Sequence, residues 1–459
     1  MVNTVHKIKN VYLMGVVMKD KIFILLFVLI SFNTTTGQIN SPLEDYIKIG
    51  LESNILLKQK HINYDKALIE LKNANSLFLP NIVFNTDYTD GKGGRAISIP
   101  VGDMLNPVYS TLNQLTGSNA FPNIQNVSED FLPNNFYDTK IRTSAPIINT
   151  DIIYNRQIVK NEVEIKEYEI DLYKKELVKE IEISYYNYLS SLEAVKIYHS
   201  ALLLVNEAKR VNEALLRNGA GLQAYLLRSE SEVAEIQSQL TSAVNQSLNA
   251  KRYFNFLLNR NLDEEIIVSN DINIENLDVL DISLDKREEI NIMNKAIDIS
   301  NNILDMKKSY WIPKISGFVD LGSQSSDWKF NKDTKYYLFG FQLSVPIFEG
   351  FRNQNGIELS ELSLKENELN LLQIKNGLNL SLSIAKNQFL TEKENYNAAE
   401  KQLKAAEMYF NLINKGYQAG VNTFIETIDA RNQLTMAKTK LNITKYNVLI
   451  SYAKYKREK

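Results

Sequence analysis

The sequence predicts a mostly α-helical protein with a small amount of membrane β-structure. Four segments of about ten residues alternate apolar and polar side chains, as a strand with one apolar face does. Two much longer stretches carry apolar or small side chains at heptad spacing, which is typical of coiled-coil helices. The order of these elements occurs twice along the 459 residues. Together these observations predict duplicated long-helix hairpins joined to a sheet that meets lipid.

Composition excludes several classes of protein. The formal net charge of −2 and the pI of about 6.1 give no overall attraction to nucleic acid. There is no cysteine, so disulfides and thiolate zinc sites are absent, and the three histidines (His6, His61 and His199) are far apart. Gly91 to Gly94 lack the spacing of a phosphate-binding loop. We therefore predict no enzyme, no cofactor and no metal site.

The N-terminus resembles an export signal. Lys19 and Lys21 precede an unbroken apolar run from Ile22 to Ile30, which is too short to span a bilayer but fits the core of a signal peptide. We expect residues 1–37 to be the signal peptide, with Met18 as the more natural start. A membrane anchor or a buried strand are the alternatives.

The four alternating segments cover 81–90, 136–145, 314–322 and 337–345. In the last one, Tyr337, Phe339 and Phe341 share a face opposite Gly340 and Gln342. A proline stands at each junction between strand and helix, because proline cannot donate to a β-ladder. These prolines are Pro80, Pro146, Pro313 and Pro346.

We predict one continuous helix over 150–217, which at about 1.5 Å per residue is on the order of 100 Å long. Residues 218–221 turn the chain into a return helix. After a second pair of strands, another long helix ends at 416–420 and a second return helix follows. The offsets 346−146=200 and 420−221=199 indicate a duplication in which Gly221 corresponds to Gly420.

The expected segments follow from these patterns. They are 38–79, an N-terminal helical segment; 80–146, a first transmembrane β-hairpin with a long external loop; 147–259, a first helical hairpin; 260–285, a linker or equatorial segment; 286–312, a helix; 313–346, a second β-hairpin; and 347–459, a second helical hairpin with the C-terminus.

Four strands cannot close a barrel, and open sheet edges are not tolerated in lipid. Other copies of the chain must therefore complete the wall, and the long helices would continue it as a tube. The alternative at this point is a half-buried soluble sheet with a coiled-coil arm.

Residues 343–350 (LSVPIFEG) and 416–430 (GYQAGVNTFIETIDA) resemble signature stretches of the TolC family of outer membrane efflux proteins, and the likeness extends over the chain after the leader. The resemblance implies a homotrimer with four strands per chain in a single β-barrel and an α-barrel in the periplasm. It further implies a passive outer membrane channel of a Gram-negative bacterium, in a tripartite efflux or type I secretion system. Its partners would be a periplasmic adaptor and an inner-membrane pump of the RND or ABC type, with drugs, metals or proteins as cargo.

The resemblance also implies functional residues at the periplasmic end. Glu426 and Asp429 match acidic residues that narrow the aperture, and Tyr417 matches a residue that holds the closed state. Asn422 stands where some relatives have arginine, and Leu227 stands where the first repeat would have an acid. From the residues alone, Thr423 and Glu426 form a capping box and Asp429 is a solvated surface residue.

The two turns would meet the adaptor, through Gly219, Gly221 and Leu222 in the first and Gly416, Gly420 and Val421 in the second. Ordinary helix-turn chemistry explains these glycines equally well. A periplasmic coiled-coil adaptor or scaffold without a pore is the alternative function. It predicts one helical hairpin and no strands with an aromatic face.

Overall fold

The computed structural model describes residues 42–458 apart from 269–273, 275–276 and 280–285. The expected signal peptide lies outside the described residues, as does much of the expected 260–285 segment. The chain forms two compact units. The first comprises residues up to 54, 177–278 and 388–454, and the second comprises 55–176, 279–387 and 455–459.

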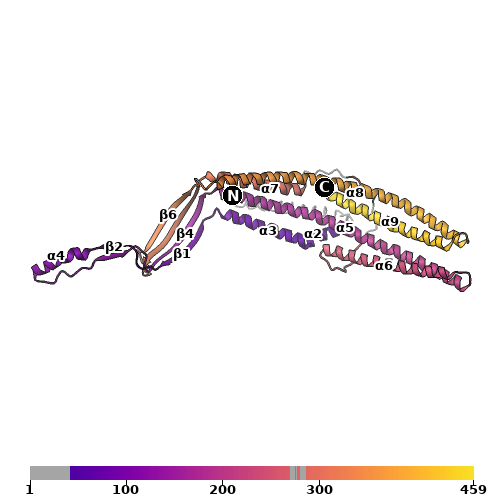
Figure 1. Ribbon diagram of the computed structural model, residues 1–459, viewed down its shortest axis with the longest axis horizontal. Helices are drawn as coiled ribbons and strands as arrows, with labels where there is room; N and C mark the ends of the chain where they lie inside the picture. The colour runs from indigo at the N-terminus through magenta and orange to yellow at the C-terminus, as the bar shows by residue number, and fades with distance from the viewer. Residues whose placement is uncertain (1–41, 269–273, 275–276, 280–285, 459) are drawn as a thin grey trace, which may run out of the picture. The chain divides into compact units, whose positions relative to one another are not determined.

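Two helices of nearly equal length dominate the chain (Figure 1). Helix α5 covers Thr150–Arg217 and α8 covers Arg352–Gln418, with 68 and 67 residues. Their return helices are α6 (Gln223–Leu257) and α9 (Phe424–Arg457). The prediction of a helix over 150–217 is therefore confirmed. No helix within the described part of the chain has the length and apolar character needed to cross a membrane.

The shorter helices differ slightly from expectation. The N-terminal helical segment is two helices, α2 (Pro42–Ser53) and α3 (Ile55–Ser76). Asn54 interrupts them, and its side-chain amide donates to the carbonyl of Leu257 at 3.1 Å. Helix α7 (Glu288–Lys308) continues into the 3-10 turn η1 (Ser309–Trp311).

The second unit contains one antiparallel four-stranded sheet, in the order β1-β4-β5-β6. The strands are β1 (Asn81–Thr89), β4 (Phe136–Ile148), β5 (Lys314–Ser326) and β6 (Lys335–Ser344). Pro80 and Pro313 directly precede strands, and Pro346 lies two residues after the end of β6. Pro146, however, lies inside β4. The strand continues past it because the ladder with β5 shifts register between Pro146 and Ile148, as at a bulge.

The strand register confirms that the sheet has two chemically different faces. One row runs Phe84, Ile141, Leu321 and Tyr337 across the four strands. These side chains and their neighbours on the same face stay exposed, with Phe341 74% exposed. The adjacent row on the opposite face pairs Arg142 with Asp320, at 2.7 and 2.6 Å between the guanidinium and the carboxylate.

Aromatic rings cluster at the end of the sheet away from the long helices. The Trp328 ring stacks on Tyr88 and on Tyr137, with centroids 5.5 and 5.2 Å apart. Tyr137 is fully buried and also contacts Phe330. Aromatic side chains at the rim of an apolar band are typical of the interfacial girdles of membrane barrels.

The expected external loop between β1 and β4 is folded rather than irregular. It contains β2 (Ala96–Ile99), helix α4 (Val101–Thr116) and β3 (Val127–Asp130), and β2 pairs antiparallel with β3. We refer to residues 91–135 as the arm.

Candidate functional site

The two turns between long helices have the same backbone geometry. Gly219 and Gly420 are both left-handed, with φ of 72° and 74°. Behind them, the N–H groups of Ala220 and Val421 donate to the carbonyls of Leu215 and Gly416, at 2.9 and 2.8 Å. This six-to-one bond and the left-handed glycine define a Schellman motif. The two turns are therefore equivalent, with an offset of 420−219=201 residues.

The expected correspondence of Gly221 with Gly420 is wrong. The position equivalent to Gly221 is Asn422, since 422−221=201. Gly221 has an ordinary φ and is needed for a different reason. A Cβ there would lie 2.6 Å from the backbone nitrogen of Leu216, so the turn passes too close to its own helix for a side chain.

This register reassigns the residues of the first turn. Glu426 is equivalent to Tyr225, because 426−225=201, and Asp429 is equivalent to Arg228. Leu227, which was expected at the position of an acidic residue, is equivalent to Ile428, because 428−227=201. Leu227 is exposed on α6.

Glu426 forms the reciprocal capping box expected from the residues alone. Its carboxylate accepts from the backbone N–H of Thr423 at 2.6 Å and from the Thr423 hydroxyl at 3.0 Å. The Glu426 N–H donates to the Thr423 hydroxyl at 3.3 Å. These hydrogen bonds hold the pKa of Glu426 below its ordinary value, and the bond from the Thr423 backbone N–H has the largest effect. The Asn422 amide adds a bond at 3.3 Å, so Asn422 supports the cap.

Asp429 lies one helical turn beyond Glu426, and both side chains are exposed. Its carboxylate accepts from Gln433 at 2.8 Å and from the Tyr409 hydroxyl at 3.5 Å. Desolvation and the nearby Asp429 charge raise the pKa of Tyr409. Two carboxylates therefore share one exposed face of α9, where they would attract cations.

Tyr417 belongs to an aromatic contact between the two turns. The Phe424 ring lies 6.3 Å from Tyr417 and 5.1 Å from Tyr225 of the first repeat. Burial raises the pKa of the Tyr417 hydroxyl. The turns are thus joined by ring packing at this level.

A buried ion pair that the sequence does not predict also links the repeats. The Arg431 guanidinium on α9 donates to the Glu232 carboxylate on α6 at 2.9 Å, and both side chains are at most 10% exposed. Burial raises the pKa of Glu232 and lowers that of Arg431. Oε1 of Glu232 and Nε of Arg431 have no hydrogen-bond partner in the described structure. Neither local sequence gives a signal for this pair, because the partners are 199 residues apart.

The residues expected to meet an adaptor lie at the two turns, where Val421 is 79% and Leu222 is 58% exposed. The glycines Gly219, Gly221, Gly416 and Gly420 shape the backbone there. Each turn therefore presents one aliphatic side chain beyond a glycine.

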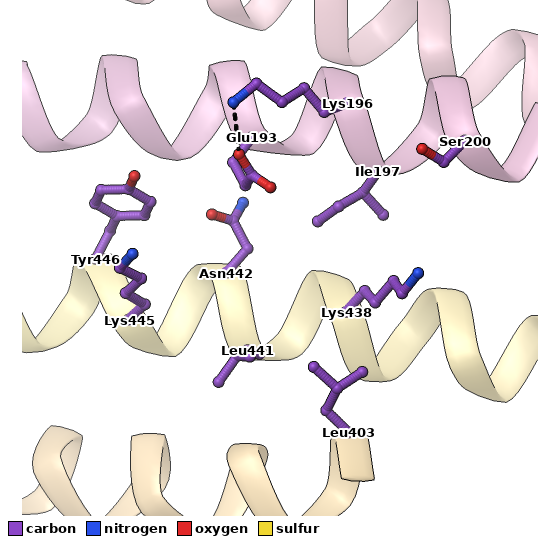
Figure 2. Close-up of a pocket in the computed structure, with 10 residues that line it drawn as sticks. All are labelled: Glu193, Lys196, Ile197, Ser200, Leu403, Lys438, Leu441, Asn442, Lys445 and Tyr446. Carbon is purple, nitrogen blue, oxygen red and sulfur yellow. Dashed lines mark hydrogen bonds and ion pairs between the residues drawn. The ribbon is translucent and has the colours of Figure 1, made fainter. Parts of the chain in front are cut away.

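A pocket of about 360 Å³ lies further along the same unit, between α5, α9 and α8 (Figure 2). Lys196, Lys438 and Lys445 line it, together with Tyr446 and Asn442. Lys196 is paired with Glu193 at 3.0 Å. The lining thus combines three lysines with the carboxylate of Glu193.

Comparisons with known proteins match part of this chain to one family model and most of it to one fold. Residues 279–454 match the model of a family described as "Outer membrane efflux protein". The alkaline protease secretion protein AprF of Pseudomonas aeruginosa is 21% identical over 177 residues, which are 38% of this chain and 37% of AprF. The chain thus spans little more than a third of that relative.

Solved structures share the fold over most of the chain. The CmeC outer membrane channel of Campylobacter jejuni is 16% identical, with a TM-score of 0.74 over 91% of this chain and 85% of CmeC. The open state of the MtrE outer membrane channel of Neisseria gonorrhoeae is also 16% identical, with a TM-score of 0.73 over 91% of this chain and 88% of MtrE. At these identities the likeness establishes the fold.

Proposed function

Because residues 279–454 match the model of the outer membrane efflux protein family, we propose that this chain is one third of a passive outer membrane channel. Three copies share one β-barrel in the outer membrane and one α-helical tunnel in the periplasm. The channel carries substrates that an inner-membrane pump and a periplasmic adaptor deliver, and it catalyses no reaction.

One observation carries this proposal: the sheet has an exposed apolar face and two unfinished edges. Among the described strands, β1 pairs only with β4, and β6 pairs only with β5. Backbone groups on such edges cannot remain unpaired in lipid. Pairing β6 of one copy with β1 of the next closes a barrel of 3×4=12 strands. The apolar face then meets lipid.

The polar face becomes the lumen of the barrel. Its charges are balanced locally, since Arg142 pairs with Asp320 and Lys140 with Asp138. Charge selection by the barrel itself is therefore weak, and substrates of either sign can pass. The pore-free scaffold considered above leaves the apolar face without a role.

The selective element is the periplasmic aperture. Threefold symmetry turns Glu426 and Asp429 into two rings of three carboxylates, which favour cations and repel anions. Leu227, Tyr417 and Asn422 border the same region, Tyr417 through its ring contact with Phe424. Leu222 and Val421 are the side chains that would pack against adaptor helices.

Partners follow from the same assignment. The adaptor engages the two turns, and the pump, of the RND or ABC type, supplies the energy. AprF, by its name, serves protease secretion, so type I secretion and small-molecule efflux are both included in the proposal.

Conductance in planar bilayers tests the proposal. The purified protein should form channels that prefer cations, and Glu426→Gln with Asp429→Asn should reduce that preference and raise anion permeability. Asn432→Asp on the same helix is the matched control, because it adds an exposed carboxylate without changing the size of the side chain and should preserve cation preference. Recovery of the protein as a water-soluble monomer without detergent would overturn the channel.

A further inference from the structure

The arm between β1 and β4 is held in one shape by its own side chains. Asn106 and Asn113, seven residues apart on α4, each form two hydrogen bonds with the returning backbone. The Asn106 amide donates to the Ile124 carbonyl at 2.9 Å and accepts from the Ile124 N–H at 2.8 Å. The Asn113 amide makes the same pair with Phe121, at 2.8 and 3.1 Å. The side of α4 that carries Asn106 and Asn113 is therefore occupied by hydrogen bonds to the returning segment of the same chain.

Gly102 fixes how closely the two segments approach. A Cβ at this position would lie 2.3 Å from the carbonyl oxygen of Ile124. The C-terminus of α4 is closed by Gly117 in the left-handed conformation, whose N–H bonds to the Asn113 carbonyl. The arm is thus a folded unit with a fixed orientation of its helix.

Another face of α4 carries an apolar seam at heptad spacing. Its members follow each other at steps of four, three, four and three residues: Val101, Leu105, Val108, Leu112 and Leu115. Leu115 is 78% exposed and Val108 is 52% exposed, so much of the seam lies open. This spacing is the pattern by which one helix packs along another helix.

The composition of α4 argues against a lipid surface as the partner. Helices that lie in the interface use Lys and Arg on their polar face to bind anionic headgroups. Helix α4 contains no Lys or Arg and one Asp, Asp103. Its polar side is also occupied by the Asn106 and Asn113 contacts. A second helix of the same kind is the occupant that fits.

The base of the arm is tied to the rim of the sheet. The Asn135 amide donates to the Asp327 carboxylate at 2.6 Å, and the Tyr88 hydroxyl donates to Asn135 at 3.2 Å. In a closed barrel, equivalent arms therefore start from the same rim. Because they are attached to one assembly, their effective concentration is high. A 16-residue helix that is marginal alone can then associate.

We propose that α4 is a self-association element: the seams of three α4 helices, one from each copy, pack together and cap the outer mouth of the channel. This inference rests on the proposed trimer. It makes the arm a barrier at the outer mouth of the β-barrel.

Single cysteines test the cap directly, because the chain contains none of its own. Val108→Cys and Leu115→Cys place thiols on the seam, and mild oxidation of the purified full-length protein should give disulfide-linked dimers. Ser110→Cys and Gln114→Cys on the opposite face are matched controls and should give none. Disulfides need Cα atoms within about 7 Å, so linkage reports close packing.

Light scattering of the same samples separates this inference from the proposed function. Trimers with seam-specific disulfides support the cap. Trimers that lack seam-specific disulfides would overturn the cap but not the channel. Labelling of Leu115→Cys by a lipid-soluble maleimide in vesicles would have the same consequence. Monomers overturn the channel, and with it the cap. In bilayers, Leu115→Asp should raise the conductance of the trimer, whereas Gln114→Asp should not.

Discussion

The two turns at the ends of the helical hairpins share a backbone but not a chemistry. In the first turn Leu215 faces Gly221, and in the second turn Gly416 faces Asn422. A Cβ on Gly221 would lie 3.1 Å from the Cβ of Leu215, and a Cβ on Gly416 would lie 1.8 Å from the Asn422 amide oxygen. The large and small partners have exchanged places between the repeats.

This exchange indicates that the two repeats keep the same backbone geometry at the turn, although their side chains differ. One member of each pair must be glycine so that the other can carry a side chain. The functional groups around the shape are then free to diverge. Asp429 and Arg228, at equivalent positions, have opposite charges, and Thr423 caps its helix where Leu222 has no capping side chain.

The largest expected effect comes from breaking the Glu232–Arg431 link between the repeats. Arg431→Leu leaves a buried carboxylate unpaired and should destabilise the protein by about 3 kcal/mol, measured by thermal unfolding. The double variant Glu232→Leu/Arg431→Leu should recover most of the loss, because no buried charge remains. A double variant as unstable as the single one would contradict this account.

Substituting the glycine of each exchanged pair, Gly221 or Gly416, should have the next largest effect on stability. Gly416→Ala and Gly221→Ala each introduce a clash and should cost about 1–3 kcal/mol by overpacking. The two should respond differently to a second change. Asn422→Gly should rescue Gly416→Ala, since the clash is with the Asn422 side chain. No side-chain change should rescue Gly221→Ala, since the nearest atom is a backbone nitrogen. Equal rescue would refute the distinction; double-mutant cycles measure it.

The difference in helix capping between the two turns should have a smaller effect on stability. Thr423→Ala removes the capping hydroxyl of α9 and should cost about 1 kcal/mol, whereas Leu222→Thr should stabilise the start of α6 by up to about 1 kcal/mol. Hydrogen exchange of the first turn of each helix measures both. Protection that is unchanged by both substitutions would mean that the caps do not determine the stability of these turns.

The pH dependence of the two turns is the finest comparison. The pKa of Glu426 is lowered in the folded chain, so its cap stabilises the second turn above the ordinary carboxyl pKa. That contribution is lost as the pH falls through the lowered pKa. The hydrogen-exchange protection factor of the amides near Thr423, taken relative to the intrinsic exchange rate at each pH, should fall on acidification, and Glu426→Gln should remove the trend. The first turn, with Tyr225 in the equivalent position, should not share it.

Long-range organisation was largely predictable from the sequence because heptads and alternation leave a strong periodic signal. The limits of α5, the faces of the four strands and the duplication followed from it. The register of the first turn did not. Gly221 and Gly420 look alike in sequence, but one is a close approach and the other is a left-handed cap, and only backbone angles distinguish them.

The missed features depend on short helices and distant partners. The Gly and Pro residues around helix α4 predict a loop, although the four-three spacing of its apolar residues is a usable signal for a helix. Asn54 and Pro146 changed element limits through a single hydrogen bond and a bulge. The Glu232–Arg431 pair could not be found, because it requires knowing which helices lie together.

The unfinished edges of the sheet have a genetic consequence. If each wall is built from three interchangeable copies, a chain whose β6 cannot pair spoils every ring that it enters. A cell making sound and defective copies in equal amounts would assemble only about one ring in eight from sound copies alone. Alleles that damage β1 or β6 should therefore be dominant, whereas alleles that prevent synthesis should be recessive.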